Sequence, residues 1–297
     1  MTDLKEALDR ARREHKGSIG KSNASQTLNP VSAGRVSTSS VNQSAPAGQE
    51  ATRFVLPART ERERVNTTHN FSYQQTRVVE LDKKWLEQNR VIAGNLGDKR
   101  VEAYRQLRTQ ILHTLSENNW NTLAITSPMK DAGKTLTAVN IAISLAQEID
   151  KTVLLVDLDL SMPNVHTTLG VNVEHGLSDI ISGDAAIRDV LFNPGIERLT
   201  ILPGRPLVDY SSELLTAPAM KNLLQDIKSR YQSRIVIFDL PPLLRNDDAL
   251  KFTPYADATL MVVEAGVNSP EEIERSMHLL RNANLIGTIL NKAKQGV

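Results

Sequence analysis

Residues 121–143 place an apolar run, a polar loop and a second apolar run in direct succession, with Gly133-Lys134-Thr135 where the second run begins. This order predicts a strand that passes through a tight loop into a helix. Backbone N–H groups of such a loop and of the first helical turn point into one concavity and bind phosphate. The lysine adds a mobile cation, and the threonine hydroxyl can bind a magnesium ion that bridges two phosphates. We therefore expect a nucleotide site here.

The loop departs from the usual G-x-x-x-x-G-K-[ST] pattern, because Pro128 stands at the first glycine position. A Gly-Lys-Thr tripeptide alone occurs by chance in many chains. The flanking residues strengthen the prediction: the run before the loop is apolar and β-capable, and the residues after it suit a helix buried against a sheet.

Two later apolar runs end in carboxylates. The run at 152–157 leads into Asp157 and Asp159, and the run at 235–239 ends in Asp239. In an open parallel sheet the carboxyl ends of the strands form the ligand crevice, so we expect these acids to face the nucleotide. Magnesium takes oxygen ligands and keeps several waters, so one acid near the metal and another acting through water is expected. A single aspartate there is often only a cap or turn former; three together predict a magnesium site.

Strands and helices alternate from residue 99 to the end, which predicts an α/β fold with a doubly wound, mostly parallel sheet. Most predicted strands are continuous apolar runs, as expected for strands covered on both faces. The strands are predicted at 122–126, 152–157, 199–202, 235–239, 259–263 and 287–290. The helices are predicted at 99–118, 136–147, 177–182, 217–231 and 270–283, the last with Ser269 as its cap.

The amino-terminal quarter has a different composition. Residues 1–16 have apolar side chains at helical spacing among many charges, which predicts a short amphipathic helix, either solvated or docked on a partner. Residues 17–75 are rich in small and polar side chains, with too few large apolar ones to offset the entropy of ordering. We expect them to form a disordered tether, and residues 76–297 to form one P-loop NTPase domain.

Composition excludes several classes of function. The formal net charge is +1 and the isoelectric point is about 8.0, so bulk charge gives no support for nucleic-acid binding. The chain has no cysteine, which removes disulfides and thiolate metal sites and fits a reducing cytoplasm. No apolar run approaches the roughly 20 residues that span a bilayer, so we expect no direct membrane span.

The stretches TSPMKDAGKT, VLLVDLDLSMPNVH and IVIFDLPPLL resemble the Walker A, Walker A′ and Walker B motifs of the bacterial tyrosine kinases of capsule and exopolysaccharide synthesis. Their order and spacing also match, and the resemblance covers residues 98–292. It implies an ATP- and Mg²⁺-dependent protein-tyrosine kinase that regulates polysaccharide polymerisation or export. It also implies a cytoplasmic protein recruited to the inner face of the plasma membrane by a separate membrane polysaccharide co-polymerase.

The resemblance assigns roles to individual residues. Lys134 would hold the phosphates, and Asp159 would polarise the attacking hydroxyl. Magnesium would lie near Thr135, Asp157 and Asp239. The nucleotide would contact Asp131, Ala132, Gly133, Lys134, Thr135 and Leu136 of the loop, and Asn291, which matches a position that contacts the base in relatives.

Glu102, Arg105 and Arg108 follow one another at steps of three on the helix before the first predicted strand. Steps of three rotate a side chain by only about 60° around a helix, so the three could share one strip. The strip could be no more than a solvated charged edge. The pattern E-x-x-R-x-x-R also resembles the self-association motif of the same kinases, which implies a ring-like homo-oligomer.

Three departures from the family pattern bear on activity. Asp131 adds an acid to the loop, which weakens phosphate binding unless Lys130 or magnesium compensates it. Ser161 stands where relatives commonly have an arginine. The sequence also has no tyrosine after Tyr255, whereas many relatives end in a tyrosine cluster. Tyr73 within the tether, tyrosines of a partner, a switch ATPase and a pseudokinase therefore remain alternatives.

A positioning-type ATPase of the same superclass is the main alternative. Those relatives usually carry a signature lysine five residues before the loop lysine, where this chain has Met129. A dinucleotide-binding oxidoreductase is excluded because the first strand–helix turn lacks the closely spaced glycines that pyrophosphate binding requires.

Overall fold

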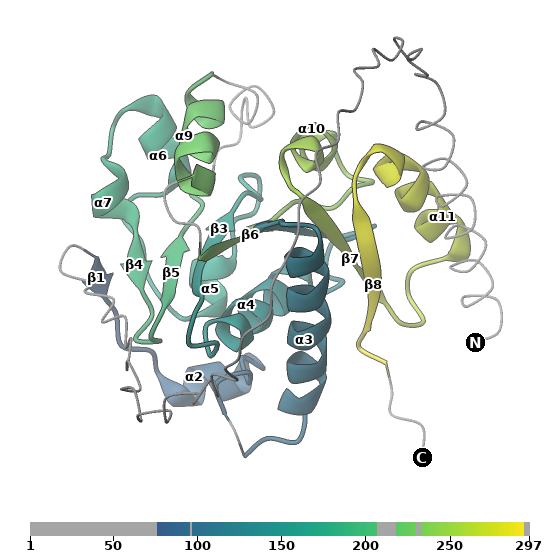
Figure 1. Cartoon of the computed structure of the whole chain (residues 1–297), viewed down its shortest axis with the longest axis horizontal. Coiled ribbons are helices and arrows are strands. Elements are labelled where there is room, and N and C mark those ends of the chain that lie inside the picture. The colour runs from purple at the N-terminus through teal and green to yellow at the C-terminus, as the bar shows by residue number, and fades with distance from the viewer. Residues whose placement is uncertain (1–75, 96, 207–217, 230–232, 294–297) are drawn as a thin grey trace, which may run out of the picture.

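The computed structural model describes residues 76–95, 97–206, 218–229 and 233–293. The predicted amino-terminal helix at 1–16, the predicted tether at 17–75 and Tyr73 lie outside these residues. Within the described part, a single sheet with helices on both faces forms the domain (Figure 1). No helix of the described residues is long and apolar enough to cross a membrane.

The sheet has eight strands in the order β1-β4-β5-β3-β6-β2-β7-β8. All neighbouring strands are parallel except β4 and β5, which confirms the predicted mostly parallel sheet. The strands are β1 (Arg77–Val78), β2 (Thr122–Thr126), β3 (Thr152–Asp157), β4 (Phe192–Asn193), β5 (Leu199–Leu202), β6 (Arg234–Asp239), β7 (Ala258–Glu264) and β8 (Leu285–Asn291).

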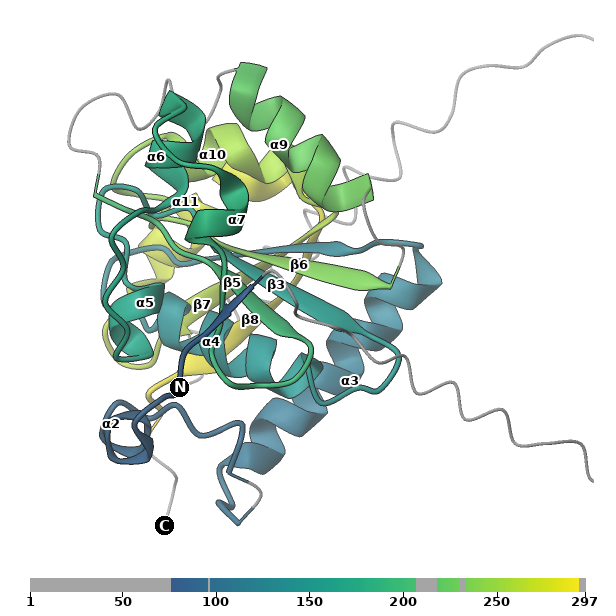
Figure 2. The same cartoon turned by 90° about the vertical axis from the view of Figure 1, so that its left-hand side faces the viewer.

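Two helical layers cover the sheet, one on each face (Figure 2). The first layer contains α2 (Lys83–Gln88), α3 (Val101–Glu117), α4 (Lys134–Leu145) and α5 (Val165–Thr168). The second contains α6 (Leu177–Ser182), α7 (Ile187–Val190), α9 (Pro218–Ser229), α10 (Asp248–Phe252) and α11 (Pro270–Leu279), with short 3₁₀ turns η1 (Thr253–Tyr255) and η2 (Leu280–Asn282).

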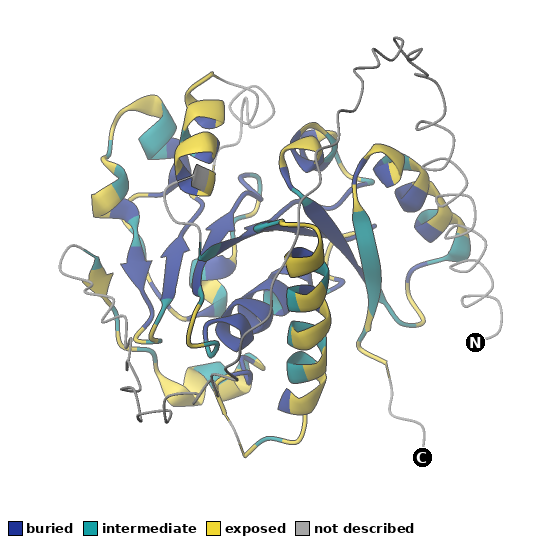
Figure 3. Ribbon diagram, in the orientation of Figure 1, coloured by how far each residue is buried: buried dark blue, intermediate teal, exposed yellow. Residues whose placement is uncertain are grey.

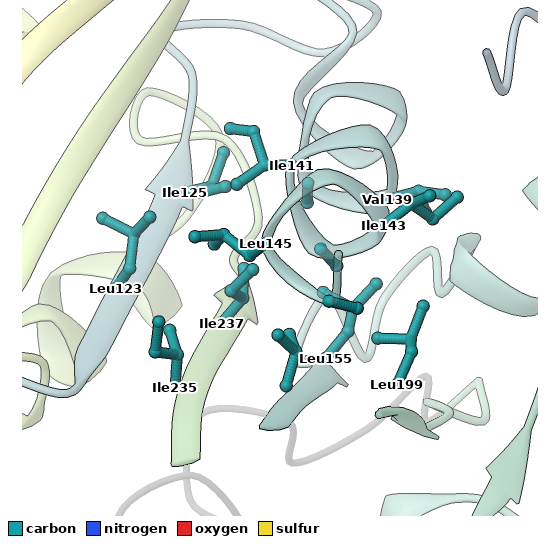
Figure 4. Packing of buried hydrophobic residues seen from close by; sticks show 14 of the residues in the cluster. Leu123, Ile125, Val139, Ile141, Ile143, Leu145, Leu155, Leu199, Ile235 and Ile237 are labelled. Carbon is teal, nitrogen blue, oxygen red and sulfur yellow. The ribbon is translucent and has the colours of Figure 1, made fainter. Parts of the chain in front are cut away.

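Alternation along the strands supplies both layers with apolar side chains. In β2, Leu123 and Ile125 join the core under α3 and α4, whereas Ala124 joins the core under α9, α10 and α11. Successive side chains of a strand point to opposite faces, so a continuous apolar run is needed when both faces are covered. Figure 4 shows the first core, where Ile141 and Leu145 of α4 lie against the sheet.

The long predicted elements agree with the structure within about two residues at most ends. The strands predicted at 122–126, 152–157 and 199–202 match β2, β3 and β5, and Ser269 caps α11 as predicted. Its hydroxyl accepts the N–H of Glu272 and the Glu272 carboxylate accepts the N–H of Ser269, which makes a capping box. Six short elements were not predicted, because they have six residues or fewer and show no clear periodicity: β1, β4, α2, α5, α7 and α10.

Helix α4, which begins at the predicted nucleotide loop, is the most enclosed long helix of the described part (Figure 3). All of its residues are buried except Leu136. Its outer side is covered by α3 and by residues 90–93. The buried Asn140 joins α4 to that segment: its Oδ1 accepts the N–H groups of Ile92 at 2.8 Å and Ala93 at 2.9 Å. Its Nδ2 donates to the carbonyl of Arg90 at 3.2 Å.

We expect Asn140→Ala to lower the free energy of unfolding by about 2–4 kcal/mol, because two buried backbone N–H groups lose their acceptor. Urea unfolding followed by circular dichroism measures this. The matched control is Asn118→Ala, which removes an exposed side-chain bond to Thr114 and should change stability by about 0.5 kcal/mol or less. Equal effects of the two substitutions would contradict the role assigned to Asn140.

Candidate functional site

The register of the strands brings the predicted site residues together at the carboxyl ends of the central strands. Strand β6 lies between β2 and β3, and its last residue, Asp239, pairs with Ile125 of β2 and Asp157 of β3. The loop that follows β2 therefore starts beside both carboxylates. This is the carboxyl-end crevice that the sequence predicts for an open α/β sheet.

The loop between β2 and α4 has the backbone of a phosphate-binding turn. Asp131 and Gly133 both adopt left-handed conformations, with φ of 63° and 88°. Aspartate tolerates this region better than most residues, and glycine adopts it without steric cost. A Cβ atom at this position would also lie 2.2 Å from Nδ2 of Asn291, so the Asn291 side chain would have to move away from the loop. Lys134 is then the first residue of α4, so its amide belongs to the positive end of the helix.

Lys134 is buried and lies among the acids. Its Nζ is 2.8 Å from Oδ2 of Asp159 and 3.8 Å from Oδ1 of Asp239, and it donates to the Thr135 hydroxyl at 3.2 Å. Burial alone would lower the pKa of Lys134, but attraction to Asp239 and Asp159 outweighs burial and raises it. The lysine is therefore a fixed positive charge in the site.

Thr135 and Asp239 form an oxygen pair suited to a magnesium ion. The Thr135 hydroxyl donates to Oδ2 of Asp239 at 2.6 Å. The other oxygen, Oδ1, is buried and has no hydrogen-bond partner within the described part of the chain. Burial raises the pKa of the Asp239 carboxyl above its usual value, which a bound cation would reverse. An unsatisfied carboxylate oxygen beside a hydroxyl fits magnesium, which takes few protein ligands and keeps its waters.

Asp157 lies beside this pair but is mostly occupied by its own turn. Its Oδ2 accepts the N–H groups of Asn164 and Val165 at 2.9 Å each, which holds the start of α5, and its Oδ1 accepts the N–H of Asp159 at 3.2 Å. Burial, with repulsion from Asp239, raises the pKa of Asp157 to about 8. A carboxylate has about four acceptor positions, so about one remains for a further ligand.

The end of β8 closes the site from the other side. Asn291 donates from Nδ2 to the carbonyl of Ala132 at 2.9 Å, so the predicted base-contacting residue touches the loop. Lys292 donates from Nζ to the carbonyl of Asp131 at 2.6 Å and pairs with Glu264 at 3.0 Å. Lys292 and Glu264 were not predicted as site residues from the sequence. The available signal was a lysine directly after Asn291 and an acid at the end of a strand.

Comparisons with known proteins decide the family. The family described as "AAA domain" matches residues 121–292. The tyrosine-protein kinase YwqD of Bacillus subtilis (strain 168) is 31% identical over 195 residues, which cover 65% of this chain and 81% of that protein. The chain belongs to the bacterial tyrosine-kinase family. The tyrosine-protein kinase etk of Escherichia coli (strain K12) is 34% identical over 199 residues, but this chain spans only 27% of its length.

Two solved structures have the same fold as this chain. The kinase domain of Escherichia coli ETK has a TM-score of 0.63 at 28% identity, and the match covers 74% of this chain and 92% of that one. The chimerical protein CapA2B2 has a TM-score of 0.65 at 26% identity, and the match covers 77% of this chain and all of that one. The nucleotide-binding P-loop fold predicted from the sequence is therefore confirmed.

In this member of the family the E-x-x-R-x-x-R residues lie on α3, away from the crevice. Arg105 pairs with Glu102 at 3.4 Å, and both side chains are exposed. Arg108 turns inward: it pairs with Glu148 at 3.0 Å and donates to the carbonyl of Ser144 at 3.1 Å, at the carboxyl end of α4. Lys134 begins the same helix and lies ten residues before Ser144, about 15 Å away along the helix axis. The three side chains therefore do not share one exposed strip within a single chain.

We expect Lys292→Met to loosen the nucleotide loop, because the carbonyl of Asp131 loses its donor and Glu264 loses its partner. Hydrogen–deuterium exchange of peptides covering 128–135 should become faster in the protein without nucleotide, while peptides from α9 stay unchanged. Lys292→Arg should restore most of the protection, and Lys221→Met, an exposed lysine of α9, is the control. Unchanged exchange in Lys292→Met would contradict a positioning role for this residue.

Proposed function

We propose that this chain is an ATP-dependent protein-tyrosine kinase that uses Mg²⁺ and regulates capsule or exopolysaccharide polymerisation or export. The observation that carries the proposal is the buried cluster of Lys134, Thr135, Asp159 and Asp239, which meets at the loop that opens α4. The relatives also support the proposal, because etk and YwqD, which are 34% and 31% identical to this chain, are tyrosine-protein kinases.

The loop and Lys134 would bind the phosphates of ATP. The amides of 131–136 supply donors at a helix amino terminus, where negative charge is stabilised. Thr135 and Asp239 would hold magnesium, with Asp157 contributing its remaining acceptor position, directly or through water. The metal would neutralise charge on the phosphates during transfer. Asn291 already contacts the loop and would lie beside the base.

Asp159 would act on the substrate hydroxyl. In this structure its Oδ2 accepts from Lys134 at 2.8 Å. A bound phosphate would compete for the lysine, and Asp159 would then be available to accept a hydrogen bond from a tyrosine hydroxyl. Free tyrosine has a pKa near 10, so a buried carboxylate close to the phenol helps to remove its proton as the new bond forms. Phosphoryl transfer asks the protein chiefly for this kind of positioning and charge stabilisation.

The proposal extends to location and assembly. Self-association into a ring-like homo-oligomer would use the α3 residues Glu102, Arg105 and Arg108. A membrane polysaccharide co-polymerase, as a separate chain, would recruit the kinase to the inner face of the membrane. The exposed Glu102 and Arg105 support a direct contact with a neighbour, and the inward Arg108 supports a role in holding α3 on α4.

Phosphotyrosine formation with ATP and magnesium tests the proposed activity, measured by mass spectrometry on a tyrosine-containing acceptor with and without the cytoplasmic part of a candidate co-polymerase. Lys134→Met should lower the rate by about 100-fold or more, because charge stabilisation of the transferred phosphate is lost. Asp159→Asn should lower transfer strongly while leaving nucleotide binding largely intact. Lys221→Met is the matched control.

One outcome would favour the switch-ATPase alternative. This is ATP hydrolysis that depends on Lys134 but gives no phosphotyrosine, even with the partner present. The Tyr73→Phe variant tests whether Tyr73 of the chain itself is the acceptor. Unchanged total phosphorylation of this variant would exclude Tyr73.

The different roles proposed for the two arginines of α3 predict different effects of replacing them. Arg105→Ala should reduce self-association in sedimentation velocity without changing the melting temperature. Arg108→Ala should lower the melting temperature as well, because Glu148 and the end of α4 lose a partner. Thr109→Ala, an exposed neighbour on α3, is the control. Identical behaviour of all three variants would contradict the assignment.

A further inference from the structure

Arg245 lies at the outer rim of the candidate site, in the segment 240–247 that connects β6 to α10. Its side chain is exposed, and its Nη1 donates to the sulfur of Met162 at 2.8 Å. Met162 belongs to the segment 158–164, which connects β3 to α5. The contact therefore joins the loops that follow two neighbouring strands of the sheet.

Hydrogen bonds fix this rim relative to Asp159. The backbone N–H of Met162 donates to the carbonyl of Asp159 at 3.0 Å and to its Oδ1 at 3.2 Å. On the other side of Arg245, the N–H of Leu244 donates to the carbonyl of Pro128 at 3.1 Å, at the start of the nucleotide loop. Asp159 is 4% exposed and Met162 is 54% exposed, so Met162 and Arg245 lie outward of this buried carboxylate.

Arg245 has no acid to pair with among the residues that the structure describes. Its one bond there is to a thioether sulfur, which is a weak acceptor. The nearest acids along the chain contact other groups. Asp247 pairs with Lys251 at 2.9 Å. The buried Asp248 accepts from Asn246 at 2.8 Å. A guanidinium has five N–H donors in a planar fork that matches a carboxylate, so Arg245 can bind a carboxylate from another polypeptide.

Two exposed methionines lie at the same rim. Met162 contacts Arg245, and Met129 is in the part of the nucleotide loop that is bonded to the residue before Arg245. Met129 is exposed as well. Methionine sulfur makes favourable contacts with aromatic rings. Lys130 and Asp131, next along the loop, have opposite charges, so Arg245 makes the rim positive. The rim therefore suits a segment that combines an aromatic ring with an acid.

We propose that Arg245 is a specificity-determining residue that binds an aspartate or glutamate side chain next to the acceptor tyrosine. The proposal rests on the proposed kinase function, because it concerns the polypeptide acceptor of that reaction. The acceptor hydroxyl would have to reach Asp159, and Met162 links that carboxylate to Arg245. The phosphates of ATP would lie deeper, on the loop amides and the buried Lys134. A charge-assisted pair between guanidinium and carboxylate would therefore hold the acceptor without occupying the phosphate site.

Binding of two matched peptides tests the proposal without any transfer. Both carry one tyrosine and a fluorophore; one has glutamates on both sides of the tyrosine, and the other has glutamines. With the full-length protein, Mg²⁺ and a non-hydrolysable ATP analogue, fluorescence anisotropy should show about fivefold tighter binding of the glutamate peptide, as expected for one exposed ion pair. Arg245→Met should remove this preference, and Arg245→Glu should reverse it in favour of a third peptide with lysines. Arg188→Met, at an exposed arginine of α7, is the matched control and should keep the preference.

Phosphate transfer to the same peptides separates this proposal from the proposed function. The kcat/KM for the glutamate peptide should be about fivefold higher than for the glutamine peptide, and Arg245→Met should abolish the difference. If the binding preference is present but no peptide is phosphorylated, the kinase function fails and the role of Arg245 in binding stands. The proposal is overturned if the glutamate peptide binds no better than the glutamine peptide, or if Arg245→Met leaves the preference unchanged. It is also overturned if Arg245→Met slows transfer to both peptides by the same factor, which would place Arg245 on the transferred phosphate.

Discussion

The structure depends on one buried ammonium group among three buried carboxylates. Lys134, Asp157, Asp159 and Asp239 are each at most 9% exposed, and in their ionised forms they would carry two net negative charges. Isolated buried charges are costly, so the cluster persists only because its members face one another and the backbone. The raised pKa values of Asp157 and Asp239 show that this balance is incomplete. A divalent cation beside Asp239 would complete it, which is why an excess of acid at this position favours magnesium phosphate chemistry over a purely structural salt bridge.

The register of the central strands brings the residues of this cluster together. Because β6 is inserted between β2 and β3, residues far apart in the sequence become neighbours at one height: Ile125 and Asp157 flank Asp239. Helix α4 must then start at the same height, and its burial under α3 and residues 90–93 leaves it no freedom to shift. Asn140 is the polar part of that packing. Its side-chain oxygen accepts hydrogen bonds from two backbone N–H groups that would otherwise be buried without an acceptor.

The sequence predicted the parts of this arrangement that depend on local pattern. Apolar runs of four to six residues located the central strands, and Gly133-Lys134-Thr135 located the loop, because few other structures need those residue types at a strand–helix junction. The position of Lys292 was not predictable in this way. Lys292 contacts the carbonyl of Asp131, which is 161 residues away in the sequence. A single lysine after a strand is not part of any repeating pattern that would predict such a contact. Arg108 was misplaced on the exposed strip for a similar reason, since helical spacing gives no information about Glu148, which follows α4 and turns Arg108 inward.

The attachment of residues 76–95 has a mechanical consequence. Strand β1 pairs with β4 through only two residues, at the sheet edge opposite β8, so a pulling force applied at residue 76 would meet little resistance there. The load would next reach residues 90–93, which are bonded to Asn140 in the middle of the helix that carries Lys134 at its start. Tension on the amino-terminal side of the domain would therefore act on α4, the helix that begins with Lys134, through Asn140.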